Sequence, residues 1–131
     1  MARETVLSNA RIVLEDRILD GTLVLRDGLI AEISEGHSAT GEDMEGDFLL
    51  PGLVELHTDH LEAHYSPRPG VRWGKTAAIQ SHDAQVVTSG ITTVFDCLRM
   101  GSDADGGFEK GEMRAMADAI AEAQDEDRLR A

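Results

Sequence analysis

The sequence has few of the features that place a protein in a membrane, on nucleic acid or outside the cell. Its single cysteine, Cys97, allows no internal disulfide, which suits a reducing compartment. No apolar run approaches the roughly 20 residues of a membrane span, and the N-terminus has no signal-peptide pattern. Only 12 Lys and Arg residues stand against 25 Asp and Glu residues. We therefore expect a cytoplasmic protein that binds neither nucleic acid nor a membrane.

The first part of the chain has the pattern of short strands. A chain of 131 residues with 41% apolar residues can bury one sizeable core but is short for two complete domains. Asp27-Gly28 is a hairpin-turn signal between two runs of alternating apolar residues, and residues 35–47 read as an exposed connection rich in glycine and acids. The predicted strands cover residues 5–14, 19–26 and 29–33. We therefore predict a small antiparallel β-sheet domain over residues 1–50.

Beyond that domain the pattern changes to strand, helix, strand. Residues 48–56 are apolar almost throughout, as is typical of a strand covered on both faces in a parallel sheet. After a loop, residues 75–89 place Ile79, His82 and Val86 at helical spacing, and residues 91–97 predict another buried strand. This order is the signature of a parallel β/α crossover.

A last helix is predicted over residues 109–130, after a loop rich in glycine and aspartate at residues 101–107. Its apolar face consists of Met113, Met116, Ala117 and Ile120. The chain therefore stops where a repeating β/α architecture would continue. We predict that residues 51–131 form an α/β unit that is only the beginning of such an architecture.

Residues 54–65 carry an unusual density of metal-ligand side chains: three histidines, one aspartate and two glutamates. They follow the first predicted parallel strand, and functional groups of β/α folds gather at such carboxyl ends. Side chains two apart on a strand point the same way, so His57 and Asp59 can converge on one divalent cation, zinc or alternatively manganese. Glu62 and His64 either join this pair, orient it from outside, or lie in a solvated loop.

Other ligand-type residues have plainer interpretations. His60 is interpreted as an outward-facing bystander and His82 as a structural histidine on the apolar side of a helix. Cys97 is interpreted as a small buried hydrophobe, because nothing nearby indicates an activated thiolate. Asp96, at the end of the second parallel strand, either occupies the equivalent place one unit on or caps the following loop.

Residues 63–82 contain no Asp or Glu, although the chain as a whole is acidic. This window holds Arg68, Arg72 and Lys75. Arginine offers forked hydrogen bonds and lysine a point charge, so these three are candidates for binding the phosphates of a phosphorylated small-molecule substrate. The alternative is a loop that happens to be basic.

The stretch Phe48-Leu-Leu-Pro-Gly-Leu-Val-Glu-Leu-His57 resembles the amidohydrolase superfamily, whose first barrel strand ends in a metal-binding His-x-His. Here Asp59 replaces the second histidine. Three further motifs are similar to one branch of the superfamily, which acts in phosphonate catabolism. They are Pro67-Arg-Pro-Gly-Val-Arg-Trp73, Ser81-His-Asp-Ala-Gln-Val86 and Ser89-Gly-Ile-Thr-Thr-Val-Phe-Asp96.

This resemblance implies the first β/α units of an incomplete TIM-like amidohydrolase barrel, with His57 and Asp59 as the first-strand metal ligands. It also implies a metal-dependent hydrolase that releases pyrophosphate from the triphosphate arm of a ribose methylphosphonate. Because the later barrel strands are missing, the catalytic groups are unknown, and we expect an inactive N-terminal fragment. A homo-oligomer or a companion fragment would complete the barrel.

Two other functions stay open at this stage. A hydrolase of cyclic amides from the same superfamily would make the basic window incidental. A non-catalytic remnant or interaction module would bind a partner through an open sheet edge.

Overall fold

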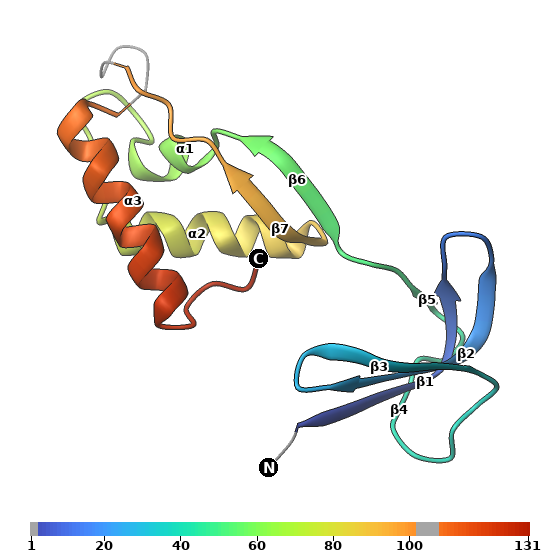
Figure 1. Cartoon of the computed structure of the whole chain (residues 1–131). Coiled ribbons are helices and arrows are strands. Elements are labelled where there is room, and N and C mark those ends of the chain that lie inside the picture. The colour runs from blue at the N-terminus through green and yellow to red at the C-terminus, as the bar shows by residue number, and fades with distance from the viewer. Residues whose placement is uncertain (1–2, 102–107) are drawn as a thin grey trace. The chain divides into compact units, whose positions relative to one another are not determined.

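The computed structural model describes residues 3–101 and 108–131, which fall into two compact units, Met1–Pro51 and Gly52–Ala131 (Figure 1). The predicted α/β class with an N-terminal antiparallel sheet is confirmed. Of the loop predicted over residues 101–107, all but Gly101 lies outside the described residues. Among the described helices none is long and apolar enough to span a bilayer.

The N-terminal unit is a five-stranded sheet built around β1 (Glu4–Val13). Strand β2 (Ile18–Arg26) pairs antiparallel with both β1 and β3 (Leu29–Glu35). The two-residue strands β4 (Glu42–Asp43) and β5 (Phe48–Leu49) pair with β1 in parallel. The prediction of a plain connection over residues 35–47 is therefore wrong at β4, because the returning chain hydrogen-bonds to the free edge of β1.

The hairpin turn predicted at Asp27-Gly28 is confirmed. Both residues have positive φ angles, 51° and 81°, as a two-residue turn requires when its twist matches that of the flanking strands. Glycine adopts this conformation without cost and aspartate tolerates it. The turn fixes the register between β2 and β3.

The C-terminal unit is the predicted parallel crossover. Strand β6 (Leu53–Thr58) leads through α1 (Leu61–Tyr65) and α2 (Lys75–Thr88) to β7 (Ile91–Asp96), which pairs with β6 in parallel. Helix α3 (Lys110–Asp125) then packs against α2. Figure 1 shows the helices of this unit gathered on one side of the strand pair.

Phe108 and Met116 lie at the centre of the C-terminal core and are 1% and 0% exposed. The Phe108 ring stacks on Tyr65 with centroids 5.3 Å apart, which joins the chain after β7 to α1. The buried members of this core come from α1, α2, α3 and the segment just before α3: Leu61, Tyr65, Ala78, Ile79, Phe108, Met116 and Ala123.

The prediction of one strand over residues 48–56 is wrong. Pro51 has no amide hydrogen to donate, and the chain divides there into β5 of one unit and β6 of the other. Gly52 marks the break, because a Cβ atom at this position would lie 2.1 Å from the Thr92 hydroxyl. A glycine is therefore required for the chain to pass so close to the start of β7.

The expectation that this segment is covered on both faces is also wrong. Leu53, Leu56 and Phe95 are 60%, 74% and 59% exposed. The helices pack on one side of β6 and β7, so within the described residues apolar side chains of these strands stay in contact with solvent (Figure 1).

Two helix predictions need correction. The segment after β6, predicted as a loop, contains α1, whose Leu61 and Tyr65 are anchored in the core. Helix α3 ends at Asp125, earlier than the predicted residue 130, and Ala117 is exposed while Ala123 is buried. The buried positions therefore lie on a stripe slightly rotated from the predicted face.

Candidate functional site

His57 lies near the carboxyl end of β6, and its imidazole is exposed. Its Nδ1 atom is 3.2 Å from Sγ of Cys97, the residue that follows β7. The amide of Cys97 donates to the carbonyl of Thr58 over 2.7 Å, which holds the two strand ends together. The interpretation of Cys97 as a buried hydrophobe is therefore wrong, because this thiol is partly exposed and contacts an imidazole.

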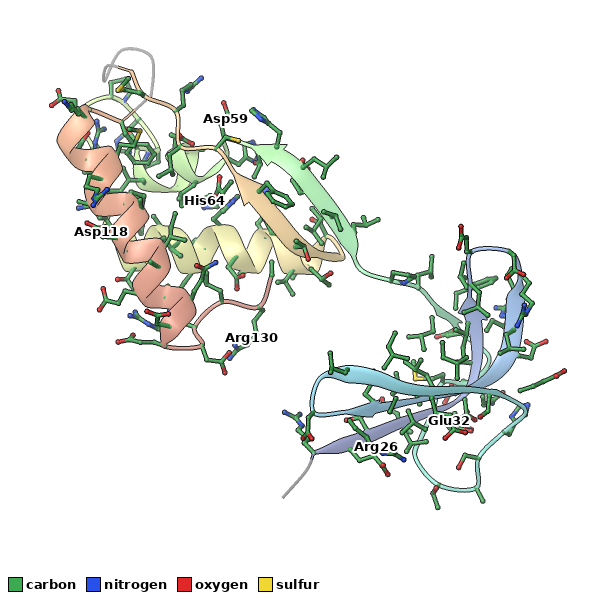
Figure 2. All side chains as sticks on the ribbon, viewed as in Figure 1. Arg26, Glu32, Asp59, His64, Asp118 and Arg130 are labelled. Carbon is green, nitrogen blue, oxygen red and sulfur yellow. The ribbon has the colours of Figure 1, made fainter. Side chains whose placement is uncertain are left out.

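Asp59, labelled in Figure 2, lies two residues after His57 and directly after the end of β6. Its Oδ2 atom is 3.7 Å from Nη1 of Arg99, and both side chains are about half exposed. Two side-chain pairs, His57–Cys97 and Asp59–Arg99, therefore connect the carboxyl end of β6 with the residues that follow β7. That the side chains of residues 57 and 59 point the same way and converge on one cation stays a prediction.

The donor atoms at this end of the sheet suit a divalent cation. His57 offers an imidazole nitrogen, Asp59 a carboxylate and Cys97 a sulfur atom, all of which bind zinc. Across residues 3–101 and 108–131, however, no three His, Cys, Asp or Glu side chains are arranged to hold a metal ion. His57 and Asp59 therefore fit as part of a coordination shell, and metal ligation by them stays a prediction.

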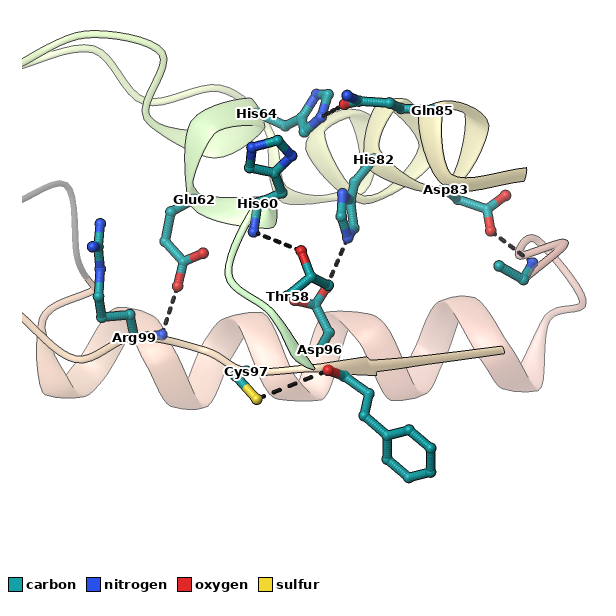
Figure 3. A network of polar contacts seen from close by, with 12 residues as sticks. Thr58, His60, Glu62, His64, His82, Asp83, Gln85, Asp96, Cys97 and Arg99 are labelled. Atoms are coloured by element: carbon teal, nitrogen blue, oxygen red, sulfur yellow. Dashed lines mark hydrogen bonds and ion pairs between the residues drawn. The ribbon is translucent and has the colours of Figure 1, made fainter. Parts of the chain in front are cut away.

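Glu62 is buried, with 4% of its surface exposed. Its Oε1 atom accepts the amide hydrogen of Arg99 over 2.6 Å (Figure 3), while Oε2 has no hydrogen-bond partner in the described part of the chain. Burial raises the pKa of Glu62, the negative charges of Asp96 and Asp59 add to this, and the Arg99 amide opposes it. Glu62 thus fixes the segment that faces Asp59.

His64 contacts two residues of α2. Its Nε2 atom is 2.8 Å from Oε1 of Gln85, and its ring centroid is 5.6 Å from that of His82 (Figure 3). His60 is exposed, and its amide donates to the Thr58 hydroxyl over 3.2 Å. The structure therefore does not bring His64 together with His57 and Asp59.

His82 and Asp96 form a close pair beneath the strand ends. His82 is 7% exposed, as predicted for a structural histidine, and its Nε2 atom is 3.1 Å from Oδ2 of Asp96 (Figure 3). The contact is close but poorly aligned, since among the described residues both ring nitrogens and Asp96 Oδ1 lack a well-formed hydrogen bond. Asp96 therefore joins α2 to β7, and no described residue hydrogen-bonds its carboxylate as a loop cap would.

Replacement of His82 by alanine is expected to lower the free energy of unfolding of the C-terminal unit by about 1–3 kcal/mol, because it leaves the partly buried Asp96 carboxylate without its neighbour. Urea unfolding followed by circular dichroism measures this. The double variant His82→Ala, Asp96→Ala should lose less than the sum of the single variants. Strict additivity would show that the two side chains do not interact.

The predicted phosphate-binding residues are placed differently from one another. Arg68 is exposed. Lys75 Nζ lies 5.7 Å from the centroid of the Tyr65 ring. Phosphate binding by these three residues stays a prediction.

Arg72 ties its loop to α3. It donates through Nε to Glu112 over 3.1 Å and through Nη1 to Ser66 over 2.5 Å. Burial acts to raise the pKa of Glu112, but the hydrogen bond from Arg72 and that from the Glu109 amide hold this pKa below its ordinary value.

Arg99 was missed by the sequence analysis. It lies after β7, outside the basic window of residues 63–82. Its one sequence signal is its spacing: Arg99 is two residues after Cys97, just as Asp59 is two residues after His57. A comparison of the two strand ends would have revealed this correspondence.

Comparison with known proteins supplies a further observation. No family model matches the chain. It is 42% identical over 121 residues to the alpha-D-ribose 1-methylphosphonate 5-triphosphate diphosphatase of Escherichia coli (strain K12), a match that covers 91% of this chain and 32% of that protein. It is also 33% identical over 96 residues to a dihydroorotase of Thermococcus kodakarensis (strain ATCC BAA-918 / JCM 12380 / KOD1), covering 71% of this chain and 21% of the relative. The chain thus spans about a third of the first relative's length.

Solved structures agree on the fold. The match to an amidohydrolase crystal structure has a TM-score of 0.54 at 24% identity. It covers 76% of this chain and 26% of the amidohydrolase. The match to the L-hydantoinase of Arthrobacter aurescens has a TM-score of 0.54 at 23% identity. It covers 72% of this chain and 20% of the hydantoinase. The predicted fold class, the first units of an amidohydrolase architecture, is thereby confirmed.

Proposed function

We propose that this chain, which corresponds in sequence and fold to part of an amidohydrolase-superfamily enzyme, supplies the first metal ligands of a hydrolase that acts on a phosphorylated substrate. The reaction would release pyrophosphate from a ribose methylphosphonate triphosphate, as the name of the Escherichia coli relative describes for that protein. The enzyme would work in the cytoplasm.

One observation carries this proposal. His57 and Asp59 both lie at the carboxyl end of β6, and each contacts a residue that follows β7, Cys97 and Arg99 respectively. In this position an imidazole and a carboxylate would hold one side of a divalent cation, zinc or alternatively manganese. Such an ion lowers the pKa of water and neutralises charge on phosphoryl oxygens. Glu62 would keep the facing segment in place through the Arg99 amide.

A second candidate is the hydrolysis of a carbon–nitrogen bond in a cyclic amide. The similarity to a dihydroorotase and the fold shared with a hydantoinase favour it. The higher identity and broader coverage of the diphosphatase favour the phosphorylated substrate. The exposed apolar side chains of β6 and β7 are what a non-catalytic interaction module would use.

A chimaera tests the proposal, because the chain spans only 32% of the relative. In it, this chain replaces the matched residues of the Escherichia coli diphosphatase. We expect metal-dependent release of pyrophosphate from ribose 1-methylphosphonate 5-triphosphate, and a loss of at least about 100-fold in the Asp59→Asn version. A folded chimaera that opens hydantoins or dihydropyrimidines and leaves the triphosphate intact would contradict the proposal.

A further inference from the structure

We propose that Glu62 accepts a hydrogen bond from a sugar hydroxyl of the substrate in the cavity beside Asp59. The inference rests on the proposed function, which makes the substrate a ribose derivative and Asp59 a metal ligand. It gives the buried carboxylate of Glu62 a second task, besides accepting the amide hydrogen of Arg99.

The position of Glu62 is fixed by the short helix that carries it. Helix α1 buries Leu61 and Tyr65, which are 1% and 5% exposed, on either side of Glu62 in the sequence. Glu62 itself is 4% exposed, and its Oε1 atom accepts the Arg99 amide hydrogen over 2.6 Å. Because the side chain is held at both ends, its other oxygen is preorganised for a ligand.

This other oxygen, Oε2, is buried and has no hydrogen-bond partner in residues 3–101 and 108–131. A buried acceptor without a partner is destabilising, and most buried polar atoms in folded proteins are satisfied. Figure 3 shows the Glu62 carboxylate between the segment that carries Arg99 and the loop that carries His60. Oε2 is therefore suited to a donor that a ligand brings.

Glu62 lines a cavity of about 310 Å³, a volume within the range of small-molecule sites. Ser66 also lines it, and its Oγ atom accepts from Nη1 of Arg72, so the hydroxyl hydrogen can be donated to a ligand. The cavity thus offers both acceptors and a donor, and Ala63 is its one apolar lining residue. The full lining consists of Asp59, His60, Glu62, Ala63, Ser66 and Arg99.

The lining favours a neutral hydroxylated group over other ligands. The carboxylates of Asp59 and Glu62 repel a phosphate, and an apolar group would leave the polar wall without partners. A metal ion at Glu62 would need more ligands, and nowhere in the described part of the chain are three His, Cys, Asp or Glu side chains arranged to hold one. A hydroxyl needs one acceptor and forms a strong hydrogen bond to a carboxylate.

Amide NMR titration of the chain with methyl β-D-ribofuranoside and with its 2,3-dideoxy analogue tests the inference, because these probes differ only in two ring hydroxyls. We expect the wild type to bind the ribofuranoside about 10-fold more tightly, the effect of a hydrogen bond to a charged group. In Glu62→Gln this preference should fall below about 3-fold, because a hydrogen bond to a neutral amide is weaker. Glutamine keeps an oxygen for the Arg99 amide.

Ala63→Leu is a second test that leaves Glu62 in place. Ala63 is exposed and lines the cavity, so a larger side chain fills the space and should weaken ribofuranoside binding at least about 10-fold. The matched control is Glu32→Gln, because Glu32 is an exposed residue of β3 in the N-terminal unit and its loss changes the net charge equally. This variant should keep the full preference.

Equal binding of the two probes by the wild type, or an undiminished preference in Glu62→Gln, would overturn this inference alone, because neither result depends on catalysis. Unchanged ribofuranoside binding in Ala63→Leu would also overturn it, whether or not Glu62→Gln folds. A chimaera that releases no pyrophosphate, while the free chain keeps the preference, would overturn the proposed function instead.

Discussion

Replacing Phe108 by alanine is expected to lower the free energy of unfolding of the C-terminal unit by about 3–5 kcal/mol. The ring is 1% exposed and stacks on Tyr65, so its removal leaves a cavity lined by α1 and α3 residues in addition to the lost burial of apolar area. The same residue accepts and donates main-chain hydrogen bonds with the segment after β7. A single-domain stability of about 5–15 kcal/mol makes this a large fraction of the total.

Urea unfolding followed through Trp73, the single tryptophan of the chain, measures the loss. Trp73 belongs to the C-terminal unit, and its amide donates to the carbonyl of Tyr65 over 2.9 Å, but its side chain is 59% exposed, so the loss of helix is followed in parallel by circular dichroism. The matched control is Phe95→Ala, because Phe95 is 59% exposed on β7. It should change stability by no more than about 0.5 kcal/mol. Equal effects of the two variants would contradict the description of the core.

Replacing His57 by alanine or Asp59 by asparagine is expected to weaken zinc binding by at least about 100-fold, since the loss of even outer-shell partners costs about 10–100-fold. The effect is large because the described residues contain no third ligand that could compensate. Asparagine preserves the shape of Asp59 and removes the charge that an ion needs. Neither change should unfold the unit, because both residues are exposed.

Zinc titration calorimetry of the two variants and the wild type measures this effect. His37→Ala is the matched control, because His37 is an exposed histidine of the N-terminal unit. It removes the same chemical group and should leave zinc affinity unchanged. A fall in affinity for His37→Ala equal to that for His57→Ala would mean that zinc binds exposed imidazoles without a specific site.

Local signals in the sequence predicted much of the fold. Alternating apolar residues and the Asp27-Gly28 turn gave the antiparallel strands, because strand period and turn chemistry are read within a few residues. Helical spacing of Ile79, His82 and Val86 gave α2 together with its buried face. The order of these elements then gave the parallel crossover.

What the sequence did not predict depends on contacts between distant segments. Helix α1 is only five residues long and is held by the packing of Leu61 and Tyr65, so periodicity could not identify it. The roles of Cys97 and Arg99 depend on the pairing of β7 with β6, which brings residues about 40 positions apart together. The division of residues 48–56 into β5 and β6 at Pro51 could not be predicted, because it depends on the different sheets that the two strands join.

The central claim is that His57 and Asp59 hold one cation between them, and histidine side-chain NMR tests it most directly. The chain has five histidines and a mass of 14.2 kDa, so each ring can be followed separately with uniform ¹⁵N labelling. On addition of zinc, the account predicts saturable shifts of the His57 ring nitrogens that disappear in Asp59→Asn. Shifts that spread evenly over all the histidines, or a His57 ring that stays unchanged at saturating zinc, would contradict it.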